Sequence, residues 1–259
     1  MTIGWDDPRT ADFYEAFCRS HDRYRAANEA LVANAALEAD HRVLDLAAGI
    51  GGTAAAVLPR LGKGGRVVCV EPAAAMRERG ESRIHDPRVE WTAGPPEGMF
   101  DRVLVGAAIW QMTPLDRTLG ALAALLRVGG ALVFDIPAAY LGVPDGPGGG
   151  DDPHLTTLPG LLVEGRSLPA AEPLDLPDVD GVEAMLVDAG LEPKRWEFRR
   201  RMTQAEYRDW LKIPPISDRM LDGVDPDDRA ARIDAAFERM DASSWRWERW
   251  VGFTAWRSR

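Results

Sequence analysis

Residues 43–52 read Val43-Leu44-Asp45-Leu46-Ala47-Ala48-Gly49-Ile50-Gly51-Gly52. The first four are apolar except for one carboxylate, and they predict a short buried strand. The glycines that follow permit a tight turn and a close approach of the backbone to a ligand. The residues after them predict the start of a helix. A strand, a glycine-rich turn and a helix in this order predict the nucleotide-binding edge of an α/β sheet.

Short apolar runs alternate with helical patterns on the C-terminal side of this stretch. We expect strands at 42–46, 67–71, 89–92, 102–106 and 131–136, and helices at 53–61, 72–81 and 114–126. The Gly129-Gly130 pair is expected to mark the turn between the last helix and the last of these strands. The alternation predicts parallel strands joined by helices. Two more helices are expected within 8–39, on the N-terminal side.

The order is interrupted from 137 to about 177 by a segment rich in glycine and proline. So long a segment is unusual for a connection inside a compact domain, and such loops are often functional. Beyond it we expect a helix at 179–189, a half-buried strand at 193–202, helices at 204–211 and 225–240, and a final strand at 245–256. The expected organisation is one domain, 1–259, with a helical cap (1–41), a cofactor-binding core (42–136), a substrate-side insertion (137–178) and a C-terminal part of the sheet (179–259) that carries a helical lid (203–241).

Composition and charge narrow the choice of partner. The chain has 259 residues, 46% of them hydrophobic, and a formal net charge of −10. Because this charge repels phosphate backbones and anionic lipids, we expect a small-molecule partner, with no nucleic acid and no membrane. The chain has two cysteines, Cys18 and Cys69, which suggest no disulfide framework, so we expect a cytoplasmic protein. We also expect a monomer or a homodimer. The sequence contains no cluster of Cys and His residues, so we expect no metal site.

Two carboxylates bear on the nature of the cofactor. The segment 49–54 fits the loose glycine pattern of dinucleotide-binding proteins, so a nicotinamide-dependent oxidoreductase is one alternative. Asp45 favours another ligand, because a carboxylate before the glycines would repel a pyrophosphate and could pair with the ammonium of an amino-acid moiety. Glu71, about 20 residues beyond the glycines, can accept hydrogen bonds from both hydroxyls of a ribose. Glu71 fits either kind of cofactor.

Four segments together resemble the class I S-adenosylmethionine-dependent methyltransferases. They are the opening stretch, Val70-Glu71-Pro72, Phe100-Asp101-Arg102-Val103 and the run 125–133, and their order and spacing match that family. The run 250–257 is similar to the family's last strand. The resemblance implies a doubly wound, seven-stranded, Rossmann-like sheet with an antiparallel last strand. It also implies an enzyme that transfers a methyl group from S-adenosyl-L-methionine to a small organic acceptor at O, N or C and releases S-adenosyl-L-homocysteine.

The resemblance also implies positions for the site residues. It places Asp45 and Gly49 at the methionine portion of the cofactor, Glu71 at its ribose, and 108–111 beside the reacting centre. The candidate cofactor-binding residues are Asp45, Ala47, Gly49, Gly51, Glu71, Pro72, Met76, Ala108 and Trp110. The sequence departs from the family at Ala47, where a glycine is usual, and at 93–96, where Ala-Gly-Pro-Pro replaces the acid that often contacts adenine.

Methyl transfer from a sulfonium is driven largely by alignment, so little acid–base machinery is required. If a base takes part, the candidate catalytic residues are Tyr14 and His154. The candidate substrate residues are Gln111, Tyr140 and His21.

Two alternatives remain at this stage. A nicotinamide-dependent reductase of the short-chain type needs a lysine four residues after a tyrosine, and none of Lys63, Lys194 and Lys212 stands there. A non-methylating protein that binds S-adenosylmethionine would share the same fold. The high content of alanine, glycine, arginine and aspartate is typical of proteins from bacteria with GC-rich genomes. By that association we expect a role in specialised metabolism.

Overall fold

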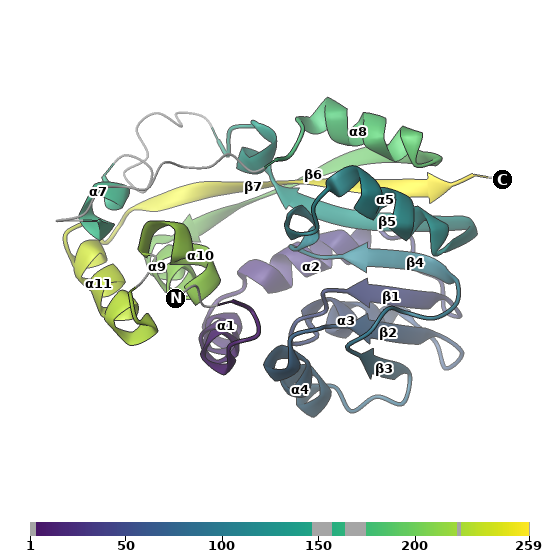
Figure 1. Ribbon diagram of the computed structural model, residues 1–259, viewed down its shortest axis with the longest axis horizontal. Coiled ribbons are helices and arrows are strands. Elements are labelled where there is room, and N and C mark those ends of the chain that lie inside the picture. The colour runs from purple at the N-terminus through teal and green to yellow at the C-terminus, as the bar shows by residue number, and fades with distance from the viewer. Residues whose placement is uncertain (1–3, 147–156, 164–174, 222–223, 259) are drawn as a thin grey trace. The chain divides into compact units, whose positions relative to one another are not determined.

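The computed structural model describes residues 4–146, 157–163, 175–221 and 224–258 (Figure 1). The chain divides into two compact units. The sheet unit comprises Arg23–Val143, Leu174–Phe198 and Arg249–Arg259. The helical unit comprises Met1–Asp22, Pro144–Pro173 and Arg199–Glu248. The two helices expected within 8–39 therefore belong to different units.

Seven strands form one sheet in the order β3-β2-β1-β4-β5-β7-β6. Their bounds are β1 Arg42–Leu46, β2 Arg66–Val70, β3 Val89–Thr92, β4 Phe100–Val105, β5 Leu126–Pro137, β6 Leu191–Thr203 and β7 Trp245–Arg257. β1 pairs in parallel with both β2 and β4, whereas β7 runs antiparallel to β5, with Ala131 opposite Trp256. Figure 1 shows β7 pointing against β1 and β4. The predicted fold class, a seven-stranded doubly wound sheet with a reversed last strand, is confirmed.

Both faces of the sheet are covered, which explains the continuous apolar runs of the parallel strands. On one face, α2 (Arg23–Ala33), α3 (Gly52–Val57) and the short helix η1 (Leu58–Arg60) pack on side chains that include Val43 and Val67. On the other, α5 (Leu115–Ala124) and α8 (Val179–Asp188) pack on side chains that include Leu44 and Val68. The alternation along β1 and β2 thus fills two cores and leaves the carboxyl ends of the strands for polar residues.

The predicted turn at Gly129-Gly130 is wrong. β5 already begins at Leu126, and its pairing with β4 shifts register between Phe100 and Arg102. A Cβ on Gly130 would lie 2.9 Å from the carbonyl oxygen of Arg127, so the close backbone approach requires glycine here. The glycines therefore form a bulge within the strand rather than its start.

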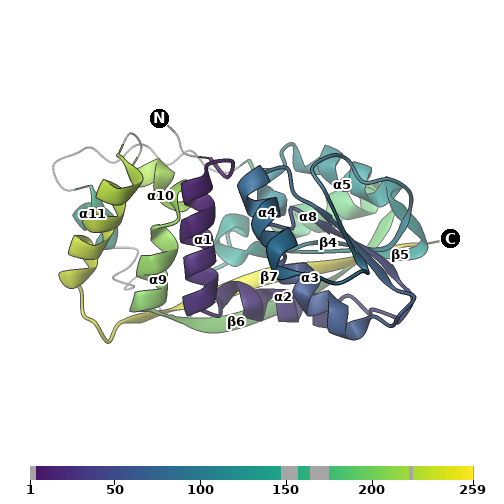
Figure 2. The same cartoon turned by 90° about the horizontal axis from the view of Figure 1, so that it is seen from below.

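The helical unit contains α1 (Pro8–Ser20), α7 (Leu158–Leu162), α9 (Gln204–Leu211), α10 (Pro214–Leu221) and α11 (Pro226–Glu238). Figure 2 shows α1, α9, α10 and α11 beside one another. Apolar side chains of α7, α9, α10 and α11 form a separate core. The sequence analysis did not predict α10, because the Pro214-Pro215 pair suggests a break. Proline is tolerated in the first turn of a helix, where no hydrogen bond is lost. Within the described residues no helix has the length and apolarity needed to span a bilayer.

Candidate cofactor and acceptor site

Asp45 lies near the end of β1 and is fully buried. Its Oδ2 accepts a hydrogen bond from the Ala54 N–H at 3.0 Å, whereas Oδ1 has no partner among the described residues. Burial raises the pKa of Asp45 to about 8; the Ala54 hydrogen bond opposes this rise and the nearby Glu71 charge adds to it. A buried carboxyl with an unused oxygen fits the ammonium of an amino-acid moiety, which would make the ionised form favourable.

The turn after β1 contains three residues with left-handed backbone conformation: Ala47 (φ +57°), Gly49 (φ +54°) and Gly51 (φ +84°). The Gly51 N–H donates to the Ala48 carbonyl at 2.8 Å and closes the turn. The family usually has glycine at the position of Ala47. The reason is therefore the left-handed backbone conformation and not the size of the side chain. An alanine in this conformation is strained by about 1–2 kcal/mol.

The Ala47→Gly variant is expected to unfold at a higher denaturant concentration than the wild type. Relief of the left-handed strain is partly offset by the greater chain entropy of glycine in the unfolded state, which leaves a gain of about 0.5–1 kcal/mol. Urea unfolding followed by circular dichroism measures the difference. A loss of stability in this variant would contradict the backbone conformation given for residue 47.

Glu71 follows β2 and holds the turn in place. Its Oε2 accepts the Gly49 N–H at 2.8 Å, and its Oε1 accepts the Ala73 N–H at 2.9 Å, just before α4 (Ala74–Arg83) begins. Each carboxylate oxygen has a second acceptor site, so Glu71 can also receive hydrogen bonds from ribose hydroxyls. The buried Met76 borders the same turn, since a Cβ on Gly49 would lie 3.7 Å from its Cε. Pro72 is exposed beside Glu71.

Asn28 of α2 belongs to the site, although the sequence analysis did not identify it. Its Oδ1 accepts a hydrogen bond from Thr53 Oγ1 at 3.1 Å. A Cβ on Gly52 would lie 2.6 Å from Asn28 Nδ2, and one on Gly106 would lie 2.9 Å from Asn28 Oδ1. Asn28 thus connects α2 to the glycine turn and to the end of β4. A single asparagine within a helix carries no sequence motif, so no local signal pointed to it.

The segment after β4 is fixed by Asp135 at the end of β5. Asp135 is buried, and its Oδ1 accepts the Ala107 N–H at 2.7 Å. Ala107 has φ +52°, and the short helix η2 (Ile109–Gln111) follows it. The sequence analysis did not place Asp135 in the site. In the structure it orients the segment that presents the predicted residues Ala108 (buried), Trp110 (half-buried) and Gln111 (exposed).

The Asp135→Ala variant is expected to lower kcat about tenfold while KM for S-adenosylmethionine changes less, because the segment after β4 loses its hydrogen bond but the glycine turn stays intact. Asp135→Asn keeps an acceptor oxygen and should restore most of the rate. Steady-state kinetics give kcat and KM for the wild type and the two variants and so test this expectation. Equal losses in the Ala and Asn variants would show that the Ala107 hydrogen bond is not the important contact.

Aromatic side chains gather beside η2. The Trp110 ring lies 5.6 Å from the Tyr140 ring and 6.0 Å from the Trp250 ring, measured between centroids. Tyr140 belongs to the short helix η3 (Ala138–Leu141), which follows β5, and Trp250 lies on β7 opposite Pro137. The predicted residues Trp110 and Tyr140 are therefore brought together, and Trp250 joins them.

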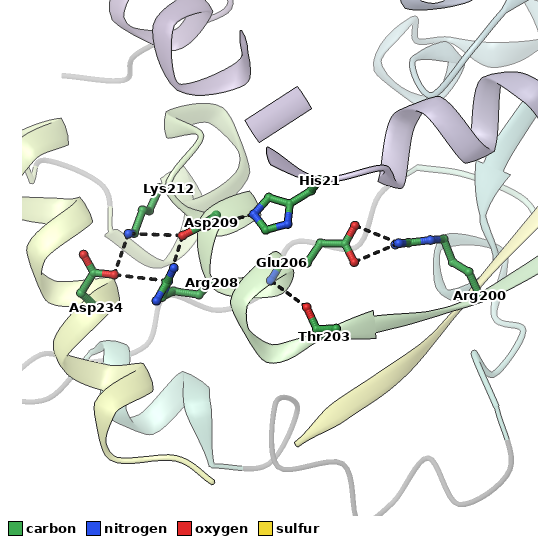
Figure 3. Close-up of polar contacts among 8 residues, drawn as sticks. All are labelled: His21, Arg200, Thr203, Glu206, Arg208, Asp209, Lys212 and Asp234. Atoms are coloured by element: carbon green, nitrogen blue, oxygen red, sulfur yellow. Dashed lines mark hydrogen bonds and ion pairs between the residues drawn. The ribbon is translucent and has the colours of Figure 1, made fainter. Parts of the chain in front are cut away.

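The other predicted residues lie in the helical unit or outside the described residues. Tyr14 packs edge-on against Trp5, with centroids 5.9 Å apart. His21 follows α1, and its Nε2 lies 2.9 Å from Asp209 Oδ2 on α9 (Figure 3). Burial raises the pKa of Asp209, but hydrogen bonds from Arg208 and His21 outweigh it and leave that pKa below its ordinary value. His154 lies outside the described residues.

Figure 3 shows that the contacts of Asp209 extend further. Lys212 Nζ lies 3.4 Å from Asp209 Oδ1 and 2.6 Å from Asp234 Oδ1. Opposite charges thus alternate through this cluster, which ties α9 to α11 and limits the freedom of the His21 ring. Among the residues that the structure describes, no group of three His, Cys, Asp or Glu side chains could hold a metal ion.

Comparisons with known proteins agree with this fold. Residues 44–134 match the family described as a methyltransferase domain. No curated protein matches the chain.

The solved structures that share the fold include three that are each 16% identical to this chain. A Bacillus halodurans protein has a TM-score of 0.59, with 90% of this chain and 99% of that chain covered. Phosphoethanolamine N-methyltransferase 2 of Haemonchus contortus, solved with phosphomonomethylethanolamine and S-adenosylhomocysteine, has a TM-score of 0.54, with 90% and 52% covered. The [4+2]-cyclase SpnF has a TM-score of 0.54, with 89% and 80% covered. The family match over residues 44–134 and the doubly wound sheet confirm the resemblance to the class I S-adenosylmethionine-dependent methyltransferases.

Proposed function

We propose that the chain transfers the methyl group of S-adenosylmethionine to a small organic acceptor by direct displacement. The observation that carries this proposal is the pair of carboxyl groups around the glycine turn. Asp45 has an oxygen without a partner among the described residues, and Glu71 bridges the turn and the start of α4. Together they fit an ammonium group and a ribose at opposite ends of one ligand.

The role of the protein in this reaction is chiefly to bind and orient. When bound, S-adenosylmethionine supplies a methyl group activated by its sulfonium sulfur. Asp45 holds the amino-acid end, Glu71 holds the ribose, and the segment after β4 faces the reacting centre. Alignment of this kind can supply several kcal/mol of the barrier reduction without acid–base chemistry. Tyr14, His21 and His154 remain candidates for a base or for substrate contacts.

A small acceptor is favoured by charge and by analogy. The net charge of −10 disfavours nucleic acids. The Haemonchus contortus enzyme was crystallised with phosphomonomethylethanolamine, a small molecule. The fold also accommodates other chemistry, since SpnF is a [4+2]-cyclase. A non-methylating protein that binds S-adenosylmethionine is therefore the second candidate.

The decisive experiment incubates the purified protein with methyl-labelled S-adenosylmethionine and a panel of small alcohols, phenols, amines and acids. S-adenosylhomocysteine release that depends on both the acceptor and Asp45 would support the proposal, and the Asp45→Asn variant is the matched control. Tight S-adenosylmethionine binding with no release for any acceptor would favour the second candidate. Equal release by wild type and variant would contradict the proposed site.

A further inference from the structure

A group of three aromatic rings lies at the carboxyl ends of β4 and β5. Trp110 comes from η2 and contacts both Tyr140 of η3 and Trp250 of β7, with ring centroids 5.6 and 6.0 Å apart. These residues are distant in sequence, yet all belong to the sheet unit. We call Trp110, Tyr140 and Trp250 the aromatic platform.

The three rings of the aromatic platform differ in their exposure to solvent. Trp250 is 1% exposed, Trp110 is half-buried and Tyr140 is 38% exposed. Trp250 therefore supports the other two rings from inside the fold, while Trp110 and Tyr140 offer ring surface to a ligand. Large aromatic side chains that stay accessible in a group commonly mark a binding site.

The segment that leads to the aromatic platform begins beside the proposed cofactor turn, within the same unit. Gly106, which begins the segment leading to Trp110, is so near Thr53 at the start of α3 that an added Cβ would lie 2.9 Å from Thr53 Oγ1. Sheets of this type bind ligands at the carboxyl ends of strands where the strand order reverses, which here is between β1 and β4. A molecule on Trp110 would thus lie beside the expected methyl donor.

Charge distinguishes between the ligands that aromatic rings can hold. Rings of this kind bind either organic cations or flat conjugated molecules. The buried Arg23 guanidinium lies 5.1 Å from the Trp250 ring centroid and 5.0 Å from that of Tyr24. Arg23 thus covers the supporting ring. The sulfonium of the expected methyl donor carries a positive charge, so a cation on Trp110 beside it would be repelled.

We propose that the acceptor is a flat, conjugated molecule without positive charge, whose ring packs on Trp110 and Tyr140. This inference rests on the proposed function. In the transfer, a nucleophilic oxygen or nitrogen of the acceptor bonds to the methyl carbon. The carbon–sulfur bond breaks at the same time, sulfur keeps the electron pair, and the proton of the acceptor passes to water.

The test uses matched pairs of probes in the presence of saturating S-adenosylhomocysteine. The flat probes are 2-naphthol and 4-hydroxycinnamate, and the controls are their ring-saturated counterparts, 2-decalol and 3-(4-hydroxycyclohexyl)propanoate. Titration calorimetry should show at least one flat probe binding about tenfold more tightly than its saturated counterpart. Trp110→Ala and Tyr140→Ala should each weaken that binding about fivefold or more. Trp110→Phe should keep most of it.

Two controls separate the possible outcomes. Val128→Ala removes an exposed apolar side chain near the start of β5, at the other end of that strand from the aromatic platform, and should leave probe binding unchanged. The S-adenosylhomocysteine affinity of Tyr140→Ala, expected within twofold of wild type, shows that the variant is folded. Normal S-adenosylhomocysteine binding with no preference for flat probes, or with no effect of either platform variant, overturns the inference and leaves the proposed function standing. Failure of the wild type to bind S-adenosylhomocysteine overturns the proposed function, and the inference fails with it.

Discussion

The Asp45→Asn variant is expected to bind S-adenosylhomocysteine about a hundredfold more weakly than the wild type and yet to be more stable without it. The loss follows from removal of the charged partner of the ligand's ammonium, because hydrogen bonds to charged groups contribute roughly 1.5–3 kcal/mol. The gain follows from removal of a buried ionisable group. Titration calorimetry and thermal unfolding measure the two effects on the same protein.

The stability gain depends on pH in a defined direction. Because burial raises the pKa of Asp45 to about 8 from its ordinary value of 3.8, the folded state holds a proton that the unfolded state releases between these values. The stabilising effect of that proton is complete below pH 4, and it decreases as pH rises toward 8. Asparagine does not titrate. The free energy of unfolding of the variant should therefore exceed that of the wild type most clearly near pH 8. The expected difference is about 1–2 kcal/mol, because the unpartnered amide N–H of the asparagine offsets part of the gain.

The affinity of the wild type for the ligand should rise with pH, whereas its stability without ligand falls. The ammonium of the ligand prefers the ionised Asp45, so binding releases a proton at neutral pH. Wild-type affinity for S-adenosylhomocysteine should rise nearly tenfold for each pH unit from 6 toward 8, while the affinity of Asp45→Asn stays almost flat. An exposed carboxylate gives the control: Asp40→Asn should behave as wild type in both assays. A wild-type affinity independent of pH, or a variant that is less stable at pH 8, would contradict the buried, protonated state of Asp45.

Gly80→Ala is expected to destabilise the protein, although alanine normally stabilises a helix relative to glycine. Gly80 lies inside α4, and an added Cβ would lie 2.2 Å from the Trp91 ring of β3. The rigid ring cannot move aside without disturbing its neighbours, so the loss should be about 1–3 kcal/mol. Gly120→Ala is the matched control, because Gly120 lies inside α5 and an added Cβ meets nothing within 4 Å. Urea unfolding should show a gain of about 0.5–1 kcal/mol for this control.

The two glycine variants together test the packing of α4 against β3. Because α4 begins next to Glu71, displacement of the helix should also weaken cofactor binding in Gly80→Ala and not in Gly120→Ala. Equal stability changes in the two variants, of either sign, would show that Trp91 does not occupy the space beside Gly80.

The parallel part of the fold was predictable because it depends on local patterns. β1, β2 and β4 each contain a short run of buried apolar residues, and glycines or prolines mark most of the connections. The limits of β5 were not predictable, since the Gly129-Gly130 pair has the composition of a turn and acts as a bulge only through its contact with β4. Likewise α10 starts at a proline pair that suggests a break when the tertiary structure is unknown.

The arrangement of residues around the glycine turn was more predictable from the sequence than the arrangement beside η2. Asp45 lies near the end of β1, Gly49 follows that strand and Glu71 follows β2, so their meeting at one edge follows from the topology. Asn28 and Asp135 form hydrogen bonds to segments that are distant in the sequence, and no spacing in the sequence signals such contacts. Trp250 joins Trp110 only because β7 is inserted beside β5.

Titration calorimetry of S-adenosylhomocysteine at pH 8 into wild type, Asp45→Asn and Gly120→Ala tests the central claim most directly. The structure predicts one ligand per chain for wild type and Gly120→Ala with equal affinity, and binding about a hundredfold weaker for Asp45→Asn. Absence of binding to the folded wild type at high micromolar ligand, or equal affinity in all three proteins, would contradict a cofactor site built on Asp45.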